Sequence, residues 1–173
     1  MEYPEYTFLV DRMLGRLVAW LRIFGYDTKS ALDLALSPNE DTRLIAMARA
    51  EDRILLSRDE ELVDRAKKSG IRAVHILPDD VREQLEALIR AYPLRIEPEM
   101  TRCTVCNAPL RGVEDRDLGP IKRSGEVPEH LLEEHSELWI CDHCGKVYWR
   151  GSHWRNILKT ASEVKNGSGS ERT

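Results

Sequence analysis

Residues 6–21 have the sequence YTFLVDRMLGRLVAWL, and this segment contains a change from strand to helix. Its first five residues are mainly apolar and predict a short buried strand that ends at Val10, directly before Asp11. Apolar residues then recur at helical spacing from Leu14 onward, and Gly25 ends this predicted helix. A buried strand followed at once by an amphipathic helix is typical of a sheet with helices packed on it.

The same alternation continues along the first hundred residues. Further strands are predicted over residues 26–31, 54–57 and 71–77. The helix between the first two of these strands begins in a capping-box pattern at Ser37, with Pro38 at its first position. Strands separated by helices imply an α/β fold with a parallel sheet that is covered by helices on both faces.

Composition places the chain among folded, non-membrane proteins. It has 173 residues, of which 42% are hydrophobic and 32% charged. No apolar run approaches the roughly 18 residues that span a bilayer, and the acidic N-terminus does not resemble a signal peptide. We therefore expect a cytoplasmic protein with reduced cysteines. The net charge of −4 argues against a broad basic surface but leaves room for a local basic groove.

Charge and cysteine content divide the chain near Pro98. Residues 92–98 contain two prolines and predict a linker, and all four cysteines follow it. We predict one domain over residues 1–97 and a second, cysteine-containing module over residues 98–163. Residues 164–173 are rich in Gly and Ser and predict a flexible tail.

Acidic residues follow three of the predicted strands: Asp11, Asp59 and the pair Asp79-Asp80. In an open parallel sheet, ligands bind outside the carboxyl ends of the strands. Carboxylates that meet there repel one another unless a proton or cation lies between them, and a hard ion such as Mg²⁺ or Mn²⁺ suits oxygen ligands. Asp41 joins this set if the start of its helix points the same way. The alternative is that Asp79 or Asp80 caps the next helix and Asp41 interacts with its own helix dipole.

Several segments together resemble a known family. They are FLVDRMLGRL (8–17), Trp20-Leu21-Arg22, Gly25-Tyr26-Asp27, Asp41 with Leu44 and Ala48, and RILLSRD (53–59). This combination resembles the Mut-seven C-terminal RNase domain, a family of PIN-like nucleases that commonly carries a zinc ribbon after the nuclease half. The usual threonine before Arg-Asp is Ser57 here, which keeps the hydroxyl.

The resemblance implies a PIN-like parallel sheet flanked by helices, and a metal-dependent ribonuclease whose acids are Asp11, Asp41 and Asp59. Asp79 or Asp80 is the candidate for a fourth acid. Mg²⁺ or Mn²⁺ held by these carboxylates would activate water and offset charge on the phosphorus. Three arginines flank the acids and either bind phosphate or clamp the acids themselves: Arg12, Arg16 and Arg58.

The cysteines form two pairs, Cys103-x-x-Cys106 and Cys141-x-x-Cys144, with 34 residues between them. Four thiolates in this pattern predict a tetrahedral structural zinc site, with disulfides as the alternative. The separation is longer than in compact zinc ribbons, so the intervening residues must form an insertion.

Basic and aromatic residues alternate after the second cysteine pair. Lys146, Arg150 and Arg155 are candidates for RNA phosphate contacts, while Trp149 and Trp154 either stack on bases or pack the ribbon. We therefore expect RNA as the partner and zinc plus Mg²⁺ or Mn²⁺ as cofactors. The main alternative is a non-catalytic RNA- or ribosome-binding zinc-ribbon protein, and a third is a regulatory protein whose acidic face binds another protein.

Overall fold

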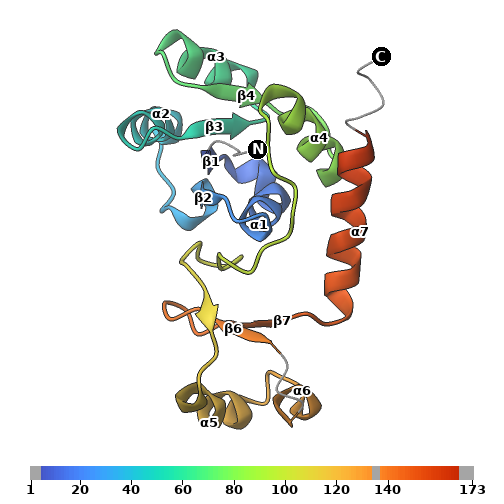
Figure 1. The fold of residues 1–173 in the computed structure, drawn as a ribbon. Coiled ribbons are helices and arrows are strands. Elements are labelled where there is room, and N and C mark those ends of the chain that lie inside the picture. The colour runs from blue at the N-terminus through green and yellow to red at the C-terminus, as the bar shows by residue number, and fades with distance from the viewer. Residues whose placement is uncertain (1–4, 134–136, 168–173) are drawn as a thin grey trace.

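A four-stranded parallel sheet forms the centre of the first half of the chain (Figure 1). The computed structural model describes residues 5–133 and 137–167. The strands are β1 (Thr7–Val10), β2 (Asp27–Ser30), β3 (Ile54–Ser57) and β4 (Ala73–His75), in the order β2-β1-β3-β4. The fold class is therefore α/β, as the alternation of strands and helices predicts.

Helices cover both faces of this sheet. They are α1 (Gly15–Ile23), α2 (Glu40–Ala50), α3 (Glu60–Lys68) and α4 (Val81–Ala91), with short 3-10 turns at η1 (Arg12–Leu14) and η2 (Ala31–Asp33). Because side chains alternate along a strand, Phe8 and Val10 join the apolar cluster of α1 and α4, whereas Leu9 joins the cluster of α2 and α3. Both faces are thus buried, which explains why the two central strands, β1 (TFLV) and β3 (ILLS), are almost continuously apolar.

Two local predictions need correction. Helix α2 begins at Glu40 rather than at Pro38, and its N-cap residue Asn39 makes no capping bond with its side chain. The Ser37 hydroxyl instead accepts from the Asn39 backbone N–H at 3.3 Å, which stabilises a turn before the helix. The strand predicted over residues 71–77 is shortened to β4, although backbone bonds from Leu55 to Arg72 and from Ile76 to Ser57 extend the ladder on both sides.

The second half contains a small antiparallel sheet made of β5 (Arg111–Gly112), β6 (Leu138–Ile140) and β7 (Val147–Trp149). Helices α5 (Asp115–Ser124) and α6 (Glu129–Glu133) lie between β5 and β6, inside the segment that separates the cysteine pairs. Their apolar residues form a separate cluster with the sheet. The predicted insertion is therefore folded. None of the described helices combines the length and the apolar character that crossing a membrane requires.

The last helix, α7 (Ser152–Gly167), returns from the small sheet to the first half and runs beside α4 (Figure 1). Ala161 and Val164 are buried in the same apolar cluster as Leu85 and Leu88 of α4. The tail predicted from Val164 is therefore wrong for residues 164–167, because the apolar face of α7 is covered by α4. Residues 168–173 lie outside the described residues.

Candidate functional site

Ser57 connects two of the predicted acids at the carboxyl edge of the sheet. β1 and β3 are neighbouring strands, and Asp11 and Asp59 follow their carboxyl ends. The Ser57 hydroxyl donates to Asp11 Oδ2 at 2.7 Å and accepts from the backbone N–H of Asp59 at 2.9 Å. Ser57 is fully buried, so its rotamer is restricted by its surroundings. Sequence reasoning recorded this hydroxyl but missed its role as a bridge between the acids.

Asp11 and Asp59 also cap the helices that follow them. Asp11 Oδ1 accepts from the backbone N–H of Arg12 at 2.6 Å, and Asp59 Oδ1 accepts from the N–H of Leu62 at 3.1 Å. Asp11 is only 9% exposed, whereas Asp59 is exposed. Within the described chain, Asp59 Oδ2 has no hydrogen-bond partner. Asp59 therefore keeps one carboxylate oxygen open to solvent.

The other candidate acids have different surroundings. Asp41 lies in the first turn of α2 and binds Arg65 of α3 at 3.0 Å. Asp79 is 88% exposed and forms an ion pair with Arg58. Asp80 caps α4 through the backbone N–H of Arg82 at 2.9 Å, and this bond lowers the pKa of Asp80. Of the pair that follows β4, Asp80 is the capping residue.

Among the described residues, the four cysteines are the one group of three or more metal-binding side chains whose ligand atoms all lie within 4.8 Å of one another. Asp11, Asp41 and Asp59 do not form a group of that closeness. The Ser57 hydroxyl links the Asp11 carboxylate to the backbone N–H of Asp59, and Asp41 pairs with Arg65 of α3.

Two of the three arginines near the acids are held in ion pairs. Arg12 binds Glu40 through Nε at 2.8 Å and through a second guanidinium nitrogen at 2.7 Å. These bonds from Arg12 lower the pKa of Glu40, so the carboxylate stays ionised. Arg58 pairs with Asp79, while Arg16 is exposed and has no acidic partner in the described part of the chain. Sequence reasoning took Glu40 as part of a capping box and so missed its role as the partner of Arg12.

The four predicted zinc ligands converge from two distant segments. Sγ atoms lie 3.5 Å apart for Cys103 and Cys144 and 3.4 Å apart for Cys106 and Cys141. A tetrahedron with Zn–S bonds near 2.3 Å separates its sulfurs by about 3.8 Å, so this spacing fits a zinc ion. Burial acts to raise the pKa of Cys103, but bonds from the Tyr148 hydroxyl and from backbone N–H groups outweigh it and lower the pKa to about 7. One thiolate is thus available near neutral pH.

The basic residues after the second cysteine pair are partly neutralised. Lys146 pairs with Glu126, and Arg150 pairs with Glu137 at 3.2 Å. The Arg150 guanidinium also lies 5.4 Å from the ring centroid of Trp139 and 5.5 Å from that of Trp154. Arg155 is exposed and has no described acidic partner.

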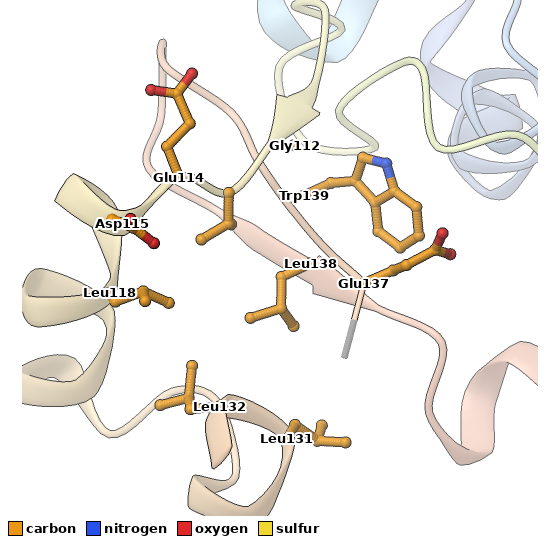
Figure 2. A pocket seen from close by; sticks show the side chains of 10 residues that line it. Gly112, Glu114, Asp115, Leu118, Leu131, Leu132, Glu137, Leu138 and Trp139 are labelled. Atoms are coloured by element: carbon orange, nitrogen blue, oxygen red, sulfur yellow. The ribbon is translucent and has the colours of Figure 1, made fainter. Parts of the chain in front are cut away.

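A cavity of about 340 Å³ lies in the insertion between the cysteine pairs (Figure 2). Leucines from α5, α6 and β6 line it, and Glu114, Asp115 and Glu137 lie among the residues around it. Acidic groups repel phosphate, so this cavity is unsuited to the RNA backbone. It belongs to the small second sheet and contains none of the predicted site residues.

A comparison with protein families supports the resemblance seen in the sequence. The model of the Mut7-C RNAse domain matches residues 6–161, which include the nuclease sheet, both cysteine pairs and most of α7. Searches of curated proteins and of solved structures return no significant match. The match covers nearly the whole chain, and the chain therefore belongs to the Mut7-C RNAse domain family.

Proposed function

We propose that this protein is a metal-dependent ribonuclease that hydrolyses RNA phosphodiester bonds. One structural observation carries the proposal: Asp11 and Asp59 follow adjacent strands of a parallel sheet and share the Ser57 hydroxyl between them. Family membership supports a nuclease-type function with RNA as substrate. Similarity to PIN-like nucleases, suggested by the motifs, is part of the same proposal.

Asp11, Asp41 and Asp59 are the residues that would hold Mg²⁺ or Mn²⁺. Their oxygen donors suit a hard cation, and Asp59 Oδ2 is free to bind one. A bound ion would supply an activated water and offset charge on the phosphate. The fourth acid would be Asp79, which pairs with Arg58, or Asp80, which caps α4 as Asp11 and Asp59 cap their own helices.

The chain itself contributes orientation. Two hydrogen bonds hold the nearly buried Asp11, one to each carboxylate oxygen, so this acid is preorganised. Asp59 is held by its cap on one oxygen and presents the other to solvent. This arrangement gives one fixed and one accessible carboxylate at the edge where phosphate would bind.

Basic residues near the acids and in the ribbon would contact RNA. Arg16 and Arg155 are the strongest candidates, because neither has an acidic partner within the described residues. Arg12, Arg58, Lys146 and Arg150 would first have to exchange an acid for phosphate.

Zinc has a structural role in this proposal. Cys103, Cys106, Cys141 and Cys144 would complete its coordination and leave no open position for substrate. Four reduced thiols require a reducing compartment, which supports the cytoplasm as the place of action.

A second candidate function is RNA binding without catalysis. The observation that favours it is that Asp11, Asp59 and Asp80 all cap helices, and caps alone explain acids at these positions.

Cleavage by acid variants separates the two functions. Labelled single-stranded RNA, structured RNA and DNA are each incubated with Mg²⁺, Mn²⁺ or chelator. We expect Asp11→Asn and Asp59→Asn to lower the RNA cleavage rate at least about 100-fold, because Asn keeps the caps but loses the charge. Asp41→Asn should lower it as well.

Asp64→Asn is the matched control, since Asp64 is exposed on α3 away from the cap. Its cleavage rate should equal that of wild type, and the Asp41, Asp59 and Asp64 variants should retain the wild-type melting temperature within a few degrees. Asp11→Asn loses one of two acceptor oxygens, so it should stay folded but melt at a lower temperature. A wild type that cleaves nothing with any metal, or acid variants at full rate, would support the binding function instead.

A further inference from the structure

The first cysteine turn (residues 103–107) and the second (residues 141–145) share their backbone hydrogen bonds but differ in the residue that follows the second cysteine. Asn107 follows Cys106 and donates its N–H to the carbonyl of Cys103 at 2.9 Å, and Gly145 follows Cys144 and donates to Cys141 at 2.8 Å. Both residues are left-handed, with φ of 68° and 77°. Glycine is the ordinary choice at such a position, so the side chain of Asn107 calls for a separate explanation.

The Asn107 side chain binds the edge strand of the nuclease sheet. Its Oδ1 accepts from the backbone N–H of Thr28 at 3.0 Å, and its Nδ2 donates to Asp27 Oδ1 at 2.8 Å. A Cβ placed at Gly145 would meet no atom within 4 Å. The asparagine therefore contacts a partner that the equivalent residue in the second turn does not have.

Arg22 makes the complementary connection from α1. It is 2% exposed, and its Nη1 donates to the carbonyls of Thr104 and Val105, both at 2.9 Å. These are the two residues between Cys103 and Cys106. Its Nε donates to the carbonyl of Thr28 at 2.9 Å. One buried guanidinium thus joins the helix, the edge strand and the first cysteine turn.

Thr28 lies in β2, the outermost strand on its side of the sheet. Its backbone N–H binds Asn107 and its C=O binds Arg22, so both groups that an edge strand would leave unpaired are satisfied. Unpaired groups on an edge strand are open to solvent and to pairing with other chains. Asn107 of the first cysteine turn and Arg22 of α1 therefore close this edge at Thr28.

We propose that the first cysteine turn stabilises the four-stranded parallel sheet at its β2 edge. Asn107 and Arg22 couple zinc binding to the closure of this edge. This inference rests on the zinc site proposed above. Zinc fixes the turn, the turn presents Asn107 and two carbonyls, and these bind β2 and Arg22. Because such coupling is reciprocal, loss of the Asn107 contacts weakens zinc retention, and loss of zinc opens the edge.

The test uses the full-length, zinc-loaded chain and compares Asn107→Gly with Gly145→Asn. Glycine keeps the left-handed turn and removes only the side-chain contacts, while the converse change adds an asparagine whose Cβ meets no atom within 4 Å. We expect Asn107→Gly to speed hydrogen exchange of the Thr28 amide about tenfold, measured by NMR, and to speed zinc transfer to a chromogenic chelator. Gly145→Asn should match wild type in both measurements.

Chelating zinc from wild type should speed Thr28 exchange by a similar factor, with no further effect in Asn107→Gly. The Leu55 and Leu56 amides of β3 report global unfolding and should keep their protection in Asn107→Gly. The coupling is overturned if Thr28 exchange in protein purified with zinc responds neither to Asn107→Gly nor to chelation. That result would leave the zinc site and the nuclease proposal intact. A purified chain that contains no zinc would overturn both the zinc site and the coupling.

Discussion

The geometry of the candidate site depends most directly on one buried residue, Ser57, through its hydroxyl group. The Ser57 hydroxyl donates to the carboxylate of Asp11, which follows β1, and accepts from the backbone N–H of Asp59, which follows β3. The orientation of Asp11 therefore depends on a side chain that belongs to another strand.

We predict that Ser57→Ala lowers both RNA cleavage and stability, because Asp11 Oδ2 loses its partner in a nearly buried position. The free energy of unfolding should fall by about 1 to 3 kcal/mol. Ser57→Thr keeps the hydroxyl and should retain most of the cleavage rate. Urea unfolding together with cleavage rates checks this, and an alanine variant that cleaves as fast as wild type would show that the bridge does not position Asp11.

Glu40 holds the Arg12 guanidinium in an ion pair. We predict that Glu40→Gln strengthens RNA binding and steepens its dependence on salt by about 0.7 in log–log slope, the value for one more phosphate contact on a single strand. Titration of RNA binding at several salt concentrations measures it. Arg12→Gln in the same background should remove the gain, and an unchanged slope would mean that Arg12 does not reach phosphate.

The sign of the pH effect follows from the lowered pKa of Glu40. A carboxyl with a lowered folded-state pKa keeps its ion pair above its usual pKa, about 4.3, and loses it only as the pH falls through the lower, folded value. We therefore expect the Glu40–Arg12 pair to persist from pH 5 to pH 8. Wild type and Glu40→Gln should differ in RNA affinity by the same factor over that range.

At the scale of elements, α7 joins the two halves of the chain. Val164 is fully buried beside α4, whereas Ser162 on the same helix is exposed. We predict that Val164→Ala lowers the free energy of unfolding by about 2 kcal/mol, and that Ser162→Ala changes it little. Urea unfolding followed by circular dichroism measures both. Equal effects would show that α7 does not depend on this contact.

At the scale of the whole molecule, the cysteine pairs bring together segments that lie far apart in the chain. We predict about one zinc per purified chain, detected by elemental analysis, and an intact mass that shows four free thiols after zinc removal. Chelation should lower the melting temperature of the whole chain, because the first cysteine turn binds α1 and β2 of the first half. A disulfide without metal would contradict the zinc site.

Local patterns in the sequence predict the α/β alternation, the acids after the strands and the two C-x-x-C pairs. These features depend on local periodicity and on short motifs. Residues close together in the chain form such patterns without contacts to distant residues. The family motif added the resemblance to the Mut-seven C-terminal RNase domain, and the family comparison confirmed the family. Two predictions were wrong, the start of α2 at Pro38 and the flexible tail from Val164. In both places, contacts in the folded chain override the local turn and composition signals.

Only the tertiary structure decided which partners these residues take. It assigned the cap of α4 to Asp80 rather than Asp79, paired Arg12 with Glu40, and placed Asn107 against Thr28. Each of these depends on which hydrogen-bond donor or charge folding brings within about 3 Å. Arg22 and Thr104 are 82 positions apart in the chain, so no local pattern encodes their contact. Such contacts arise because the N–H groups of a buried guanidinium need acceptors, and folding supplies carbonyl groups from distant parts of the sequence.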